Sequence, residues 1–196
     1  MDGRGVAGLL LTGGSSRRMG RDKAGLVMSG ERLADRAARA LRAAADPVLE
    51  VGPGFTSLPA VREEPPGGGP LAAVAEGGRR LRDRGHAGPI LVLAVDLVHA
   101  EEGLLRFLAG YPADRAVLPV DEHGRDQPLC ARYEAEDLER AAELVGTGAA
   151  SMRELLDHLD VNRVQPEEWL RVAPPDAFHD LDTPEDLDRM AQNGGR

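Results

Sequence analysis

The sequence contains little cysteine, few aromatic residues and no long apolar run. Its single cysteine, Cys130, cannot form a disulfide within the chain. Aromatic residues make up 3% of the 196 residues and hydrophobic residues 42%, so a buried core must consist mainly of leucine, valine and alanine. No segment approaches the roughly 18 apolar residues of a membrane-spanning helix, and no secretory signal pattern is visible. These absences predict a cytoplasmic protein with no membrane association.

Positive charge is scarce as well. The formal net charge of −9 argues against a surface that binds nucleic acid or anionic lipid, because both require an excess of basic residues. Lys23 is the only lysine among 24 basic residues. A compact ammonium and a planar guanidinium approach a phosphate differently, which makes Lys23 a candidate functional residue.

Short apolar runs alternate with helical periodicity in the first part of the chain, up to Val120. The expected strands are residues 6–11, 47–51, 89–96 and 115–120, and the expected helices are residues 32–45, 71–81 and 101–110. This alternation predicts an α/β fold with a mostly parallel central sheet and helices on both faces. The length fits one domain, which we expect to span residues 1–192, with a disordered tail over 193–196.

The pattern changes after Val120. Residues 127–133 are expected to be extended and to form an antiparallel edge of the sheet. Further helices are expected over 134–145, 151–159 and 183–190. The second of these begins with Ser151 and Glu154, at the spacing of a capping box, in which each side chain binds the backbone N–H of the other residue.

The first expected strand runs directly into a glycine-rich turn, Thr12-Gly13-Gly14. Glycines let a backbone approach an anion closely, and successive N–H groups can then converge on it. Hydroxyls and positive charges follow within a few residues, from Ser15, Ser16, Arg17, Arg18, Arg21 and Lys23. This composition suits the phosphates of a nucleoside triphosphate. An exposed turn with solvated arginines is the alternative, and the spacing fits neither a Walker loop nor a dinucleotide-binding motif.

Asp96 follows the most apolar expected strand, residues 89–96. An aspartate here is either a turn former or a hard oxygen ligand for Mg²⁺. Because the carboxyl ends of parallel strands meet at one edge of a sheet, we expect Asp96 and the Thr12–Gly14 turn to share a crevice.

The segment LLLTGGSSRRMGRDKA, residues 9–24, resembles the signature L-A-G-G-x-S-x-R-M-G-x-x-K of the MobA-type molybdenum cofactor guanylyltransferases. Four later segments resemble further motifs of that family in the same order, PPGGGPLAAVAEGG, LVLAVD, QPLCARY and FHDLDTPEDL. The resemblance covers nearly the whole chain. The sequence departs from the family pattern at Thr12, at Leu97-Val98, where the family has a proline-containing turn, and near Val51, where an asparagine is missing.

The resemblance implies a three-layer, Rossmann-like nucleotidyltransferase fold and the Mg²⁺-dependent transfer of GMP from GTP to molybdopterin, with release of pyrophosphate. It assigns nucleotide binding to Leu11, Thr12, Gly13, Gly14, Ser15, Lys23, Val51, Gly52, Glu63, Gly69 and Asp96. Within this set it assigns catalysis to Lys23, together with Arg18. Asp96 and Asp182 are the expected metal ligands, and Gln127 and Arg132 the expected acceptor-binding residues.

Two other functions remain open from the sequence. No side chain fixes guanine over cytosine, so a molybdopterin cytidylyltransferase or a transferase for another small phosphate is an alternative. A non-catalytic nucleotide-binding module that takes part in cofactor delivery is an alternative of a different class. The expected ligands are GTP and molybdopterin, with molybdenum cofactor biosynthesis proteins or molybdoenzymes as expected protein partners.

Overall fold

A computed structural model gives the structure of the chain and describes residues 5–13, 23–28, 30–64 and 66–179. Four predicted site residues, Gly14, Ser15, Arg18 and Asp182, lie outside these ranges. The helix expected over 183–190 and the tail expected over 193–196 also lie outside them.

A seven-stranded sheet with the order β5-β4-β1-β6-β8-β7-β9 forms the middle layer. Its strands are β1 (Ala7–Leu11), β4 (Val48–Val51), β5 (Ala60–Val61), β6 (Ile90–Ala94), β7 (Ala116–Pro119), β8 (Cys130–Tyr133) and β9 (Val161–Val164). Strands β1, β4, β5 and β6 pair in parallel, as the alternating pattern predicts. Two short strands, β2 (Val27–Met28) and β3 (Glu31–Arg32), form a separate antiparallel pair.

The expectation for residues 127–133 is half correct. Strand β8 is antiparallel, but it lies inside the sheet, between β6 and β7. All four of its residues are buried, because the strand has neighbours on both sides and helices over both faces. The edge beyond it is β9, which the sequence does not indicate because polar residues occupy the centre of VNRV.

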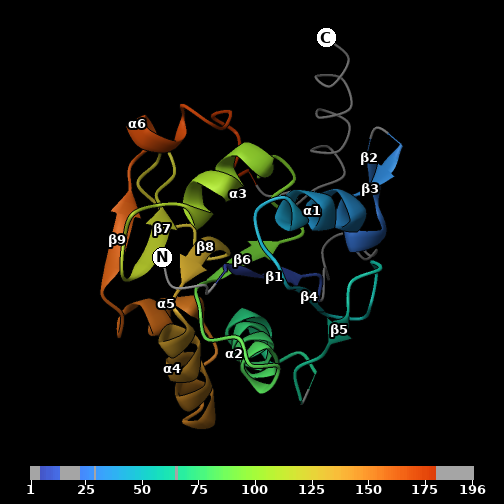
Figure 1. Ribbon diagram of the computed structural model, residues 1–196, viewed down its shortest axis with the longest axis vertical. Coiled ribbons are helices and arrows are strands. Elements are labelled where there is room, and N and C mark those ends of the chain that lie inside the picture. The colour runs from blue at the N-terminus through green and yellow to red at the C-terminus, as the bar shows by residue number, and fades with distance from the viewer. Residues whose placement is uncertain (1–4, 14–22, 29, 65, 180–196) are drawn as a thin grey trace.

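Helices cover both faces of the sheet, as expected (Figure 1). They are α1 (Leu33–Arg42), α2 (Gly69–Asp83), α3 (Glu102–Ala109), α4 (Ala135–Gly146), α5 (Met152–Leu156) and α6 (Pro166–Trp169), with a short 3₁₀ turn η1 (Lys23–Gly25). Figure 1 shows α1 and α3 on one side of the sheet and α2 and α4 on the other. None of the helices described has the length and apolar character to span a membrane.

The core divides into two layers that the central strands separate. Leu10 of β1 packs in the layer with Leu41 and Leu104, whereas its neighbour Leu9 packs in the layer with Leu71 and Leu138. Successive side chains of a strand point to opposite faces, so a strand buried on both sides must be apolar at every position. This is why the short uninterrupted apolar runs predict the central strands correctly.

The capping box predicted at the start of α5 is present. The Ser151 N–H donates to Glu154 Oε2 at 2.9 Å, and the Glu154 N–H donates to Ser151 Oγ at 3.3 Å. These contacts fix the start of the helix after the turn that ends α4.

Candidate functional site

The candidate site lies where β1, β4 and β6 end side by side. The backbone N–H groups of Thr12 and Gly13, just past β1, donate to the Val51 carbonyl at the end of β4, at 3.0 and 3.3 Å. On the other side, the Val95 N–H donates to the Leu11 carbonyl at 3.0 Å. The turn after β1 is therefore held between the ends of its two neighbours. The Thr12 and Gly13 amides are thus paired with the Val51 carbonyl.

The structure brings Lys23 and Asp96 together at this edge. Lys23 Nζ lies 3.5 Å from Asp96 Oδ2, and the two side chains are 14% and 32% exposed. An ammonium and a carboxylate thus lie close together at a partly solvated position. In such a pair the lysine ammonium can bind a phosphate oxygen, and the aspartate carboxylate can bind a cation.

One small apolar cluster anchors both charged residues. Ala24, next to Lys23, is fully buried in this cluster, and Val95 and Val98 flank Asp96 in the same cluster. The cluster explains the unusual Leu97-Val98 turn, because Val98 adds to the cluster a side chain that is 6% exposed. Arg36 of α1 supports the turn further by donating through Nε to the Val98 carbonyl at 3.3 Å.

Gly52 occupies a position where a side chain does not fit. A Cβ at this residue would lie 2.2 Å from Thr12 Oγ1 and 2.8 Å from the Gly13 nitrogen. The end of β4 and the turn after β1 therefore lie so close together that there is no room for a side chain at Gly52. The predicted nucleotide-site residues Thr12, Gly13 and Gly52 are brought into direct contact, and their contact with nucleotide stays a prediction.

We expect Gly52→Ala to destabilise the protein because its methyl group forces this contact apart. Overpacking of this kind costs about 1–3 kcal/mol, which lowers Tm by roughly 3–10 °C in a chain of this size. Thermal unfolding measures the shift. Gly146→Ala is the matched control, since a Cβ there meets no atom within 4 Å; equal shifts in the two variants would contradict the packing argument.

Glu50 is a residue of this site that the sequence analysis does not identify. It lies in β4 and is fully buried, and its carboxylate accepts the Thr12 hydroxyl at 2.6 Å. Burial raises the pKa of Glu50, but hydrogen bonds from Thr12, Thr56 and Phe55 outweigh burial and hold it below its ordinary value. The available signal was a charged residue inside the otherwise apolar run VLEV.

Glu63 and Gly69 lie on the connection from β5 to α2. The Gly67 N–H donates to Glu63 Oε1 at 3.0 Å, so this carboxylate shapes its own loop. Gly69 has a φ of +87°, and a Cβ there would lie 3.2 Å from the Ala150 carbonyl oxygen. Both conditions favour glycine at the start of α2. Nucleotide contact for either residue stays a prediction.

Gln127 lies at the same edge of the sheet as Asp96. It precedes β8, whose connection is fixed to the end of β6 by a hydrogen bond of 2.8 Å from the Ala94 N–H to the Leu129 carbonyl. Its side-chain amide donates to Asp121 Oδ2 at 3.1 Å. The placement is compatible with the predicted role in acceptor binding.

Arg132 does not fit the acceptor-binding role predicted for it. It pairs with Leu91, near the start of β6 and away from Asp96. The guanidinium is 4% exposed and donates to the Tyr111 and Ala113 carbonyls, both at 2.7 Å. The guanidinium also lies 3.5 Å from Glu134 Oε1, and its burial leaves almost no exposed surface for a substrate to contact. Its geometry indicates a structural role, which is to hold the connection between α3 and β7.

We therefore expect Arg132→Met to lower stability without changing the KM for the acceptor substrate that the sequence resemblance implies. The change leaves two carbonyls without their donors, at a cost of about 2 kcal/mol. Thermal unfolding together with steady-state kinetics checks this, and Gln127→Ala is the contrasting variant, expected to raise that KM with little loss of stability. An increased KM in Arg132→Met at unchanged Tm would restore the original interpretation.

The donor set at the site fits Mg²⁺. Within the ranges the structure describes, no cluster of three or more His, Cys, Asp or Glu side chains could hold a metal by itself. Magnesium usually binds one or two protein carboxylates and completes its coordination with water and substrate phosphates. The partly exposed oxygens of Asp96 meet that requirement, so the arrangement suits a metal that arrives with a nucleotide.

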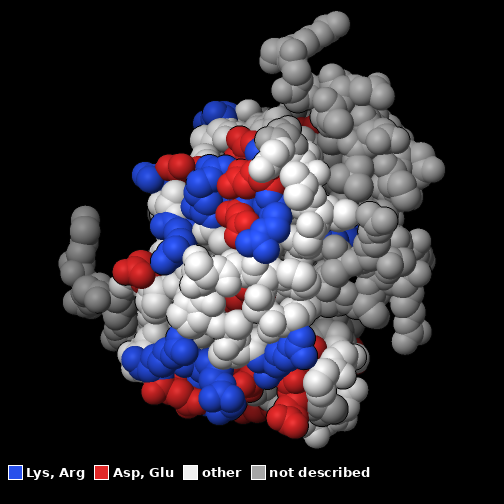
Figure 2. Space-filling model, turned by 90° about the vertical axis from the view of Figure 1, so that its right-hand side faces the viewer, with Lys and Arg blue, Asp and Glu red and all other residues white. Residues whose placement is uncertain are grey.

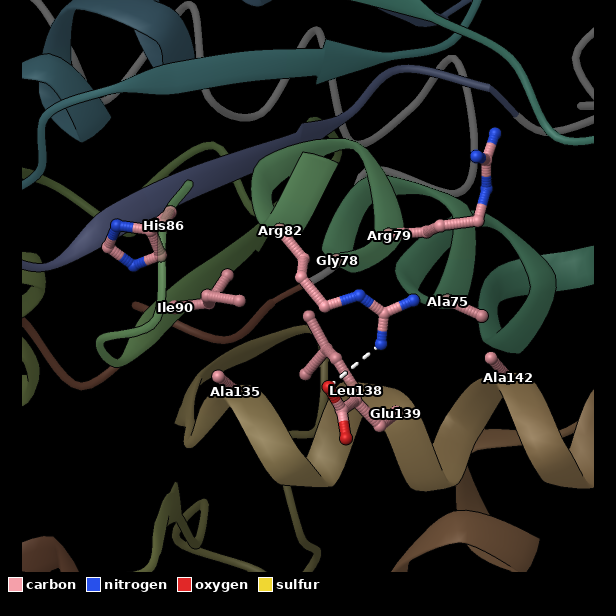
Figure 3. Close-up of a pocket in the computed structure, with 10 residues that line it drawn as sticks. All are labelled: Ala75, Gly78, Arg79, Arg82, His86, Ile90, Ala135, Leu138, Glu139 and Ala142. Atoms are coloured by element: carbon pink, nitrogen blue, oxygen red, sulfur yellow. Dashed lines mark hydrogen bonds and ion pairs between the residues drawn. The ribbon is translucent and has the colours of Figure 1, made fainter. Parts of the chain in front are cut away.

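Two other surface regions are weaker candidates for a binding site. Figure 2 shows acidic and basic side chains side by side on the face it presents, without a continuous basic surface there. Figure 3 shows a depression between α2 and α4, where Arg82 Nη1 lies 2.8 Å from Glu139 Oε1. Its volume is about 20 Å³, enough for roughly one water molecule. It also borders Ile90, at the opposite end of β6 from Asp96.

Fold and site together define an α/β protein whose central sheet carries a glycine-lined turn and a lysine–aspartate pair at one edge. The chain belongs to the family of MobA-like NTP transferase domains, which matches residues 8–164. It is 37% identical over 171 residues to a "Probable molybdenum cofactor guanylyltransferase" of Mycobacterium bovis, covering 81% of this chain and 83% of the relative. A protein of the same name from Mycobacterium avium is 35% identical over 202 residues, covering 95% of each.

Two solved structures share the fold. Molybdopterin-guanine dinucleotide biosynthesis protein A from Archaeoglobus fulgidus matches with a TM-score of 0.79 and 20% identity, over 96% of this chain and 98% of that one. The 4-diphosphocytidyl-2C-methyl-D-erythritol synthase from Anaerococcus prevotii matches with a TM-score of 0.71 and 11% identity, over 100% and 98%. The expected nucleotidyltransferase fold is confirmed.

Proposed function

We propose that this chain transfers GMP from GTP to molybdopterin and releases pyrophosphate. The observation that carries the proposal is the Lys23–Asp96 pair at the carboxyl ends of β1 and β6, in a chain whose relatives bear the name of that activity. A lysine and a carboxylate from distant parts of the chain meet where a triphosphate with its cation would bind.

The reaction needs little from the protein beyond position and charge. The attacking group is the terminal phosphate of molybdopterin, which is already ionised near neutral pH, so no protein base is required. In our proposal Lys23 neutralises the α-phosphate during attack, and Arg18 neutralises the departing pyrophosphate. Charge neutralisation by preorganised groups is usually the largest contribution to such catalysis.

Asp96 is the proposed ligand for Mg²⁺, with Asp182 as a second. Magnesium bound there supplies Lewis-acid neutralisation of the nucleotide phosphates. The ion pair with Lys23 already orients the Asp96 carboxylate, and this limits the reorganisation needed when the substrate binds. We propose that Gln127 binds the acceptor substrate. We propose that Leu11, Val51 and Gly52 contact the nucleotide through their backbone.

Pyrophosphate release with molybdopterin and GTP, CTP or UTP tests the proposal. We expect release with GTP and Mg²⁺, and none when molybdopterin or Mg²⁺ is omitted. Preference for CTP would instead identify a cytidylyltransferase. Tight GTP binding without release would identify the non-catalytic module. Protein partners of molybdenum cofactor delivery belong to the same proposal, since the product must reach an enzyme that uses it.

A further inference from the structure

Glu50 is a fully buried carboxylate that the proposed chemistry does not use. Its two oxygens accept five hydrogen bonds, all from residues past the ends of β1 and β4. Oε1 accepts the Thr12 hydroxyl at 2.6 Å and the Gly54 and Phe55 N–H groups at 3.0 and 2.7 Å. Oε2 accepts the Thr56 N–H at 2.9 Å and the Thr56 hydroxyl at 2.7 Å.

This number of donors explains how a charge is tolerated there. An unpaired buried carboxylate is very costly, whereas one that accepts several hydrogen bonds is stable as an anion. The donors come from residues 54–56 and from Thr12. Glu50 therefore ties the loop after β4 to the first residue of the glycine-rich turn. Glu50 thus fixes the relative position of the residues that follow β1 and those that follow β4.

The same loop also reaches the turn that carries Lys23. Phe55 packs against the apolar cluster that contains Ala24, Val95 and Val98. Its ring atom Cε1 lies 4.0 Å from the position that a Cβ on Gly25 would occupy. The hydrogen bond from the Phe55 N–H to Glu50 restrains the backbone from which that ring projects. A continuous path of contacts thus runs from Glu50 through Phe55 to the cluster that holds Lys23 and Asp96.

We propose that Glu50 is a positioning residue for the nucleotide: it holds residues 54–56 in place, so that Thr12 on one side and the Lys23 turn on the other keep the spacing that a triphosphate requires. This rests on the proposed function for the identity of the ligand. The residue itself stays buried and need not touch the substrate.

Glu50→Gln tests the proposal with no change in side-chain size. An amide keeps one acceptor oxygen but places an NH₂ group where the other oxygen was, so either the Thr56 N–H or the Gly54 and Phe55 N–H groups lose their acceptor. We expect the Kd for GTP, measured by calorimetry with Mg²⁺ and without molybdopterin, to rise about tenfold, and the KM for GTP to rise with it. Glu139→Gln, at an exposed ion pair with Arg82, is the matched control and should leave both constants unchanged.

A purely structural role predicts a different result. Glu50→Gln would then lower Tm while the folded protein bound GTP with the wild-type Kd, and that outcome would overturn the proposal. Should Glu50→Gln fail to fold, Thr56→Val removes the half-buried hydroxyl that donates to Glu50 Oε2 at 2.7 Å and accepts the Leu58 N–H at 3.1 Å, with an expected rise in Kd of about threefold. An unchanged Kd in that variant counts equally against the proposal.

A double-mutant cycle tests the path through Phe55. If Glu50 acts by placing this ring, Phe55→Ala raises the Kd, and the double variant with Glu50→Gln is no worse than the weaker-binding single variant. Full additivity, within about twofold, would show independent actions and overturn the path. Since Kd is measured without transfer, a wild type that binds GTP but does not transfer GMP refutes the proposed function and leaves this test intact. If wild type binds CTP more tightly, CTP is the probe.

Discussion

Lys23→Ala is expected to fold normally and to lose about a hundredfold in turnover, equivalent to about 3 kcal/mol of transition-state stabilisation. Folding survives because the buried residue of this turn is Ala24, whereas Lys23 adds a charged group to a partly solvated edge. Asp96 is 32% exposed even beside Lys23, so water can solvate the carboxylate that remains when the ammonium is removed. Pyrophosphate release at saturating GTP and molybdopterin measures the loss, with circular dichroism to confirm the fold.

Lys23→Arg sharpens this test because it keeps the charge and changes its shape. A guanidinium is broad and planar, so we expect it to restore less than a tenth of wild-type turnover. Arg106→Ala, which removes a cation from an exposed pair with Glu102, is the control and should be fully active. If Lys23→Ala kept more than half of wild-type turnover, the assigned role would be wrong.

Asp96→Asn is expected to have an effect of similar size through loss of the metal. The amide matches the carboxylate in shape but binds Mg²⁺ poorly, so turnover should fall about a hundredfold. Binding also reports on it: GTP at a hundred times its Kd stabilises a protein by about 2.7 kcal/mol, and in the variant most of the Mg²⁺-dependent part should disappear. Thermal unfolding with GTP, with and without Mg²⁺, gives this difference directly.

Asp83→Asn, at an exposed pair with Arg79, serves as the control for loss of one carboxylate. It should keep both the turnover and the magnesium-dependent stabilisation. If GTP and Mg²⁺ stabilised Asp96→Asn as much as they stabilise wild type, the assignment of Asp96 as the metal ligand would be wrong, whatever the activity of the variant.

Much of this fold follows from local sequence. The runs around Leu9 and Leu93 are apolar at every position, which only a strand covered on both faces requires, and they become the central strands. Helix α1 is equally predictable from its spacing. The placement of Thr12 and Asp96 at one edge follows as well, since a parallel sheet brings the ends of such strands together, whereas the contact of Lys23 with Asp96 does not follow from the strands alone.

The remainder depends on contacts between distant segments. The sequence near Arg132 does not reveal that β8 inserts between β6 and β7, and that insertion is what buries the guanidinium against the carbonyls of Tyr111 and Ala113. Glu50 presents the same difficulty, because a charge inside a strand reads as a surface residue until its donors from the following loop are known. Buried polar groups are defined by their partners, and these partners come from separate parts of the chain.

The cluster of Ala24, Val95 and Val98 has a consequence for how the two charged residues respond to change. Ala24 belongs to the turn that carries the cation, whereas Val95 and Val98 belong to the segment that carries the anion, so the two segments meet in this cluster. A larger side chain at Ala24 would press against the opposite segment, so uncharged residues of the cluster help to set the distance between the ammonium and the carboxylate.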